Sequence, residues 1–174
     1  MSTIDHGPCD PPIVPIRIGD AEAPNLTTRL RELFADDQAA RQTNPIDWDA
    51  LLVADAQRRR EVLSHLVAGQ IGRGESLYHA AFIFQHGACP EHFQLAHQLA
   101  EAALAAGFEQ ARWIYAATLD RYLLSIGQPQ KYGTQFLVGA NGQWVLRPYD
   151  PTTTDEERRR YNVPPLDEQL RRRG

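Results

Sequence analysis

Cysteine is scarce in this sequence, and long apolar runs are missing. The 174 residues include only Cys9 and Cys89, which lack the CxxC spacing of a zinc site. No metal site and no disulfide framework is therefore expected, and both thiols are interpreted as reduced. No apolar run approaches the ~20 residues that cross a bilayer. Acids and prolines occupy the N-terminus, where a signal peptide has a basic start and an apolar centre. These absences predict a cytoplasmic chain without a membrane partner.

A surplus of basic residues is absent too. Lysines and arginines number 18 against 22 aspartates and glutamates, a formal net charge of -4, so binding to nucleic acid is not expected. The arginine runs at 58–60, 158–160 and 171–173 are interpreted as solvated faces or a tail. There is no HExxH, GxSxG, P-loop or GxGxxG motif, so the sequence identifies no cofactor and no metal.

The composition is that of a globular protein, with 43% hydrophobic and 23% charged residues. Residues 1–24 are rich in proline, which predicts an extended or disordered N-terminal arm. Residues 25–174 are predicted to form a single helical domain. A chain of this length buries roughly 70% of its unfolded surface, so it needs no cross-link for stability.

Apolar residues recur at helical intervals as far as residue 126. The pattern predicts five helices, over residues 25–41, 47–67, 75–87, 90–107 and 108–126, with Gly87 as a left-handed cap of the third. Two short runs, 134–138 and 143–146, then flank Asn141-Gly142, which is a strong hairpin signal. A last helix is predicted over 166–172. The expected fold class is mainly α, with about five packed helices followed by a C-terminal β-hairpin and a short terminal helix.

One acidic residue lies on the apolar face of the fifth predicted helix. Asp120 shares that face with large and small apolar residues, namely Trp113, Ala116, Ala117, Leu123 and Leu124. A buried ionised carboxylate is costly without donors or a cation. Candidate partners are His86, Arg121 and the segment that follows Gly127. Both a catalytic and a structural role of Asp120 satisfy this requirement.

Two further features belong to the same candidate site. His86 ends the third predicted helix on the same face as His79, where a histidine acts as a general base or is simply bonded to a backbone carbonyl. Segment 128–135 is dense in hydrogen-bonding side chains at the change from helix to strand, and binding groups concentrate on such loops. Its candidates for binding a ligand, if they do not merely cap the helix and the hairpin, are Gln130, Tyr132, Thr134 and Gln135.

Three sequence elements stand out together: Gln85-His86, Leu119-Asp120-Arg121, and residues 127–135, which read Gly-Gln-Pro-Gln-Lys-Tyr-Gly-Thr-Gln. They resemble a bacterial family known only as a domain of unknown function, which is similar in carrying Gln-His, Leu-x-Asp-Arg and Gly-x-Pro-Gln-x-Tyr-Gly-Thr-Gln. Residues 147–150 and 163–166 also resemble its C-terminal end. The resemblance spans residues 48–170 and implies a site formed by Gln85, His86, Asp120, Arg121 and the Tyr132 loop, without a reaction. Where the family often continues with Ala-Asp after Gln-His, this chain has Gly87-Ala88.

Two functions are compatible with these residues. The first is a small hydrolase-like enzyme in which His86 is the base and Asp120 orients it. Its unidentified small molecule is bound by Gln85, Arg121, Gln130, Tyr132, Thr134 and Gln135. The second is a helical module that binds a protein or peptide, in which Asp120 is buried for structural reasons. The variety of polar groups in one loop favours the enzyme.

Overall fold

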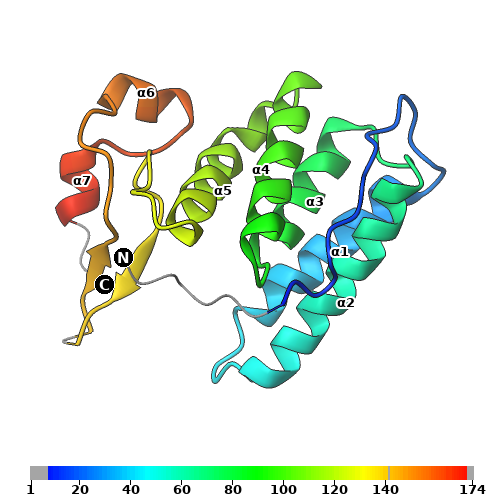
Figure 1. Cartoon of the computed structure of the whole chain (residues 1–174), viewed down its shortest axis with the longest axis horizontal. Helices are drawn as coiled ribbons and strands as arrows, with labels where there is room; N and C mark the ends of the chain where they lie inside the picture. Colours follow the sequence, from blue (N-terminus) through cyan, green and yellow to red (C-terminus); the bar gives the residue numbers. More distant parts are fainter. Residues whose placement is uncertain (1–7, 141, 172–174) are drawn as a thin grey trace.

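The computed structural model describes residues 8–140 and 142–171, and helices dominate this part of the chain (Figure 1). The elements in chain order are α1 Leu26–Ala40, α2 Trp48–Val67, α3 Gly74–Gln85, α4 Pro90–Ala105, the 3-10 turn η1 Glu109–Ala111, α5 Arg112–Ser125, β1 Phe136–Val138, β2 Trp144–Leu146, α6 Asp155–Arg160 and α7 Leu166–Arg171. The predicted fold class is confirmed, and α6 is an additional short helix. No helix among the described residues is both long and apolar enough to span a membrane.

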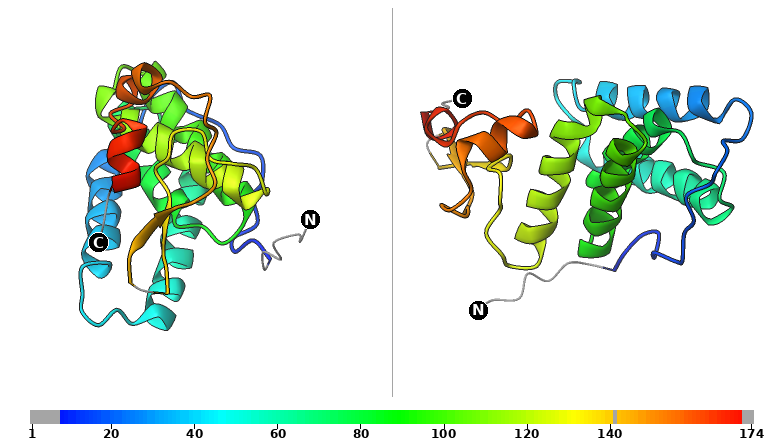
Figure 2. Two further views of the ribbon diagram at one scale, coloured as in Figure 1. Left: turned by 90° about the vertical axis from the view of Figure 1, so that its left-hand side faces the viewer. Right: turned by 90° about the horizontal axis from the view of Figure 1, so that it is seen from above.

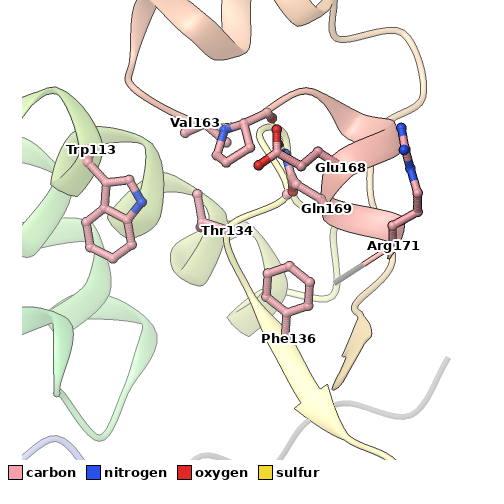
Figure 3. Close-up of a pocket in the computed structure, with 9 residues that line it drawn as sticks. Trp113, Thr134, Phe136, Val163, Glu168, Gln169 and Arg171 are labelled. Atoms are coloured by element: carbon pink, nitrogen blue, oxygen red, sulfur yellow. Dashed lines mark hydrogen bonds between the residues drawn. The ribbon is translucent and has the colours of Figure 1, made fainter. Parts of the chain in front are cut away.

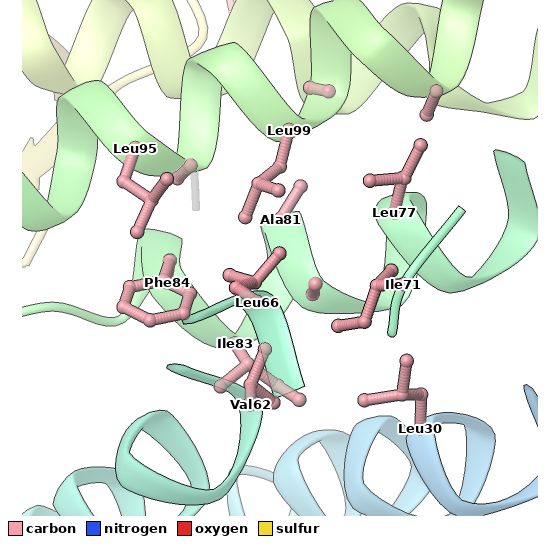
Figure 4. Packing of buried hydrophobic residues seen from close by; sticks show 14 of the residues in the cluster. Leu30, Val62, Leu66, Ile71, Leu77, Ala81, Ile83, Phe84, Leu95 and Leu99 are labelled. Atoms are coloured by element: carbon pink, nitrogen blue, oxygen red, sulfur yellow. The ribbon is translucent and has the colours of Figure 1, made fainter. Parts of the chain in front are cut away.

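The five longer helices pack around one apolar core (Figure 4). Helix α3 lies at the centre, because it packs most extensively on α4 and also contacts α1, α2 and α5. Alanines on the facing sides of α3 and α4, such as Ala81 and Ala100, are fully buried and let the two backbones approach closely. The larger core side chains include Leu30, Val62, Leu66, Leu77, Ile83, Phe84 and Leu99.

The helix ends follow local rules, with one exception that matters for the site. Asp47 caps α2, since its side chain accepts a hydrogen bond from the Ala50 N–H at 3.0 Å. Helix α3 ends at Gln85, and Gly87 is not its left-handed cap. Gly87 is instead required by close packing, because a Cβ there would lie 2.2 Å from His92 Cβ. His86 is therefore the residue that leaves the end of α3.

The described part of the N-terminal arm, residues 8–24, runs in extended form along the helical body (Figure 2). Backbone hydrogen bonds fix it, from the N–H groups of Arg17 and Gly19 to the carbonyls of Leu66 and Ile71 at 3.1 and 2.8 Å. Ile13 and Ile16 pack against the core. Residues 1–7 of the predicted arm lie outside the described residues.

Cys9 and Cys89 form a disulfide that ties this arm to the start of α4. The interpretation of both thiols as reduced is therefore wrong. The two cysteines are 80 residues apart in the sequence, so no spacing rule could connect them before the fold was known.

Two arginines of the predicted solvated runs are buried instead. Arg59 is 4% exposed, and its guanidinium donates to the backbone carbonyls of Asp10 and His86. Arg158 is 1% exposed and donates to the carbonyls of Tyr132 and Thr153. Each holds a loop whose carbonyls have no secondary-structure partner, and charge runs alone carry no signal for this use.

The C-terminal part forms a unit beside α5 (Figure 1). Strands β1 and β2 pair antiparallel, with Phe136 opposite Leu146 and Val138 opposite Trp144. The hairpin is confirmed, although Asn141 of its predicted turn lies outside the described residues. Helix α7 contacts β2, and the predicted end of this helix at residue 172 is likewise not described.

Candidate functional site

A cavity of about 600 Å³ lies where the helical body meets the β-hairpin. Five of the eight predicted site residues line it, namely Gln85, His86, Arg121, Thr134 and Gln135. The remaining lining residues come from α1, α3, α5 and the two strands: Gln38, Phe82, Trp113, Phe136 and Trp144. Residues far apart in the sequence, and predicted together, thus share one cavity. The other three predicted residues, Asp120, Gln130 and Tyr132, are buried and not part of its lining.

The carboxylate in contact with His86 belongs to Asp37, not to Asp120. His86 follows the end of α3, Asp37 lies in the last turn of α1, and His86 Nδ1 is 3.1 Å from Asp37 Oδ1. The hydrogen bonds of Asp120 among the described residues all go to the loop after α5. The expected orientation of His86 by Asp120 is therefore corrected, because the last turn of α1 supplies the partner.

Asp37 is held as an anion although it is only 1% exposed. Arg41 Nη1 donates to its Oδ1 at 2.8 Å, and Gln38 Nε2 donates to its Oδ2 at 2.8 Å. Burial acts to raise the pKa of Asp37, but the bond to His86 and the charges of His86 and Arg41 hold the pKa below its ordinary value. Arg41 is itself fixed by Asp55 at 2.6 Å.

The surroundings of His86 favour its neutral form. Burial lowers its pKa below the ordinary value, against the opposing effect of Asp37, and the charges of Arg41 and Arg121 lower it further. In the neutral ring, Nδ1–H donates to Asp37 and Nε2 keeps its lone pair. Nε2 has no hydrogen-bond partner in the described part of the chain, and the side chain, 16% exposed, lines the cavity. A histidine held in this way by a carboxylate is suited to accept a proton from a bound water or substrate.

Asp120 organises the loop that forms the opposite wall. Its Oδ1 accepts from the N–H groups of Lys131 and Tyr132 at 2.7 and 2.8 Å, and its Oδ2 accepts from the N–H and hydroxyl of Thr134, both at 2.8 Å. Burial raises the pKa of Asp120, and the four donors oppose that shift. Backbone N–H groups can only donate, so this network fits the ionised carboxylate. The predicted contact between Asp120 and the loop is confirmed, and Asp120 holds the loop in place.

Gln130 and Tyr132 are also structural parts of this loop. Gln130 Nε2 donates to the carbonyls of Gln135 and Arg147 at 3.0 Å, and its Oε1 accepts from the Gln135 N–H at 2.8 Å. Gln130 thereby joins the loop to the hairpin. Tyr132 is 2% exposed and packs its ring 5.1 Å from that of Tyr161. The predicted contact of these two side chains with a ligand is not supported by their burial.

A second cavity, of about 460 Å³, adjoins the first through Trp113, Thr134 and Phe136, which line both (Figure 3). Its far wall is formed by α7 and the segment before it, with Val163, Pro164, Glu168, Gln169 and Arg171. Gly133 allows Gln169 to lie against the loop, because a Cβ there would come within 2.1 Å of Gln169 Oε1. The two cavities thus share the aromatic rings of Trp113 and Phe136, and Phe82 and Trp144 add two more rings to the first.

Among the described residues, the one group of side chains close enough together to hold a metal ion lies outside this cavity. Ligand atoms of Cys9, Cys89 and His92 lie within 4.8 Å of one another. Both sulfurs are used by the disulfide, however, and His92 accepts from the Ala88 N–H through Nδ1 and bonds the Pro11 carbonyl through Nε2. This group has no ligand atom left for a metal ion.

Sequence reasoning missed Asp37, and a signal for it was present. Leu26, Leu30, Leu33 and Asp37 recur at helical intervals on one face of α1, and all four are buried. This is the same pattern, a carboxylate on an apolar stripe, that identified Asp120. The aromatic walls were missed because the hairpin residues Phe136 and Trp144 reach the cavity only through the tertiary fold.

Comparisons with protein-family models, with curated proteins and with solved structures found no match for this chain. The chemistry of the cavity is therefore the basis on which a function can be argued.

Proposed function

We propose that this protein is a small hydrolase-like enzyme in which His86, held by Asp37, is the general base at the cavity. The observation that carries the proposal is the pair of buried Asp37 and partly exposed His86, whose free Nε2 belongs to a cavity-lining ring. A carboxylate that fixes the tautomer of a histidine and stabilises its protonated form is a recurrent catalytic device.

A water molecule is the nucleophile in this proposal. The residues that line the cavity in the described part of the chain include no serine or cysteine, and the Thr134 hydroxyl is committed to Asp120. His86 Nε2 takes a proton from water as the water oxygen bonds to the electrophilic atom of the substrate. The imidazolium is stabilised by Asp37 and returns the proton to the leaving group when the scissile bond breaks.

The resemblance to the family with the Tyr-Gly-Thr-Gln element is compatible with this proposal. Its Gln-His element supplies the base, and its Leu-x-Asp-Arg element supplies the carboxylate that holds the Tyr-Gly-Thr-Gln loop. Family membership and a bacterial source stay proposals carried by those sequence elements. A cytoplasmic location also stays a prediction, which the Cys9–Cys89 disulfide opposes because disulfides persist mainly in oxidising compartments.

The experiment that tests the proposal compares His86→Gln with the wild type on p-nitrophenyl carboxylate and phosphate esters. Loss of the base is expected to lower kcat by about 100-fold or more, with the fold retained by circular dichroism. Asp37→Asn should lower kcat less and shift the acid limb of the pH profile, since Asp37 acts to raise the pKa of His86. His65→Gln is the matched control, because His65 bonds Gln70 at the end of α2 and does not line the cavity. A His86→Gln variant as active as wild type rules the proposal out.

The helical binding module is the second candidate function. Its support is that Asp120 is fully used in holding a loop, as that function requires. Under this alternative, His86→Gln leaves partner binding intact and no ester is hydrolysed by either protein.

A further inference from the structure

Arg121 lies at the cavity as a cation with no anionic partner among the described residues. Its Nε is buried with no hydrogen-bond partner, and no ion pair of the described residues includes its guanidinium. The group is held from one side by the ring of Phe93, whose centroid lies 5.9 Å from Arg121 Cζ. The guanidinium thus contacts a ring on one side and has unused donors on a cavity wall.

The surroundings of Arg121 are positive, although the whole chain has a formal charge of -4. Burial lowers the pKa of Arg121 to about 10, and the charges of Arg147 and Arg41 act in the same direction. The carboxylates of Asp37 and Asp55 are bonded to Arg41. No aspartate or glutamate is among the residues that line this cavity in the described chain. A partly buried cation without a partner in such a setting is stabilised when an anion binds.

Gln85 adds a second unused donor to the same wall. It is 6% exposed and lines the cavity, yet its side-chain amide makes no hydrogen bond to any described residue. Buried amides are normally bonded, and an amide left open toward a cavity is a sign of a missing ligand group. Gln85 directly precedes His86, so a group bound at this amide lies next to the catalytic base.

We propose that Arg121 and Gln85 bind the acid group of a small organic anion, a carboxylate or a phosphate, whose apolar body lies against the aromatic walls. The planar guanidinium matches either acid group through two parallel hydrogen bonds, and the Gln85 amide supplies a third. Phe82, Trp113 and Trp144 offer flat apolar surface for a ring or chain of the ligand. This proposal names the substrate class and rests on the proposed function only in assigning the anion as a substrate.

Binding of benzoate, phenyl phosphate and neutral benzamide to the wild-type protein tests the proposal by calorimetry. We expect at least one of the two anions to bind tenfold or more tightly than benzamide, and the stronger of the two identifies the acid group. Arg121→Met should abolish this preference, while Arg112→Met, which removes a surface arginine of the same helix, should retain it. Equal binding of anions and benzamide, or binding of none of the three, overturns the proposal.

A second measurement does not depend on the folding of the variant. In the wild type, titration with the preferred anion should shift the NMR signal of the Arg121 Nε–H and leave that of Arg112 unchanged. An anion that shifts neither signal, or both equally, contradicts the assignment. His86→Gln should keep the anion preference. If the wild-type protein hydrolyses no ester but still prefers anions, only the proposed function is refuted. If it hydrolyses esters but shows no preference for anions, only the anion site is refuted.

Discussion

Two aspartates on apolar helix faces have different uses in this molecule. Asp37 faces a ring that can gain a proton, whereas Asp120 faces backbone N–H groups that cannot change charge. The partner therefore decides whether a buried carboxylate takes part in proton transfer or only fixes a loop. Helical periodicity detects the burial of both residues and contains no information about the partner.

Asp120→Asn is expected to destabilise the fold by about 3 kcal/mol. Whichever way the amide is turned, its NH₂ group faces at least one backbone N–H that then has no acceptor. Urea unfolding measures the loss, and amide hydrogen exchange should accelerate at residues 131–134.

Asp36→Asn is the matched control, because Asp36 is an exposed acid on α1. It should change the free energy of unfolding by less than about 0.5 kcal/mol. If Asp120→Asn were equally mild, the loop would not depend on this carboxylate.

At the scale of elements, the contact between the loop and α7 depends on Gly133. This residue has φ +90°, and a Cβ would collide with the Gln169 side chain, which itself donates to the Tyr132 and Pro164 carbonyls. Gly133→Ala should cost about 3 kcal/mol, the sum of left-handed strain and a displaced Gln169. Thermal unfolding measures the effect.

Gly107→Ala separates the two contributions, since Gly107 has φ +80° and open space around its Cα. It should cost only about 1 kcal/mol. Equal losses at the two glycines would show that Gln169 yields without cost and that α7 is not anchored through it.

The arm is a second element whose attachment can be tested. The disulfide closes a loop of 80 residues, and a cross-link of that length stabilises by roughly 4 kcal/mol in the chain-entropy description. Reductant should therefore lower the Tm of the wild type to that of the Cys9→Ser/Cys89→Ser variant. The Tm of the variant itself should not respond to reductant, and a wild type that is equally insensitive contradicts the cross-link.

The sequence was sufficient for the long helices because each carries its own apolar stripe, as α1 does with Leu26, Leu30 and Leu33. It was sufficient for the Asp120 loop because a polar segment directly follows the helix that needs donors. It could not pair His86 with Asp37, which is 49 residues away, nor Cys9 with Cys89. Such pairs depend on how distant segments of the chain pack together, and no local sequence pattern contains that information.

For the whole molecule, buried and partly buried histidines predict sensitivity to acid. Burial lowers the pKa of His79, His86, His92 and His97 below the ordinary value. The unfolded chain then binds more protons than the folded one as pH falls through about 6.5, so stability is fully present above that pH and is lost below it. Each histidine contributes at most about 1.4 kcal/mol per pH unit within its window.

Urea unfolding at pH 7.5 and pH 5.5 measures this effect, and the midpoint should be lower at pH 5.5. The test does not need a variant in which all four histidines are replaced. His86→Gln alone should reduce the difference between the two pH values, and a midpoint that rises on acidification contradicts the prediction.

The cavity is walled by two separate parts of the chain, with the Asp37–His86 pair on the helical body and Phe136 and Trp144 on the hairpin. Substitutions in the strands can therefore change which molecules enter the cavity without changing the Asp37–His86 pair. This division suits directed evolution, because libraries of variants confined to the hairpin would change substrate selectivity and leave the Asp37–His86 pair unchanged.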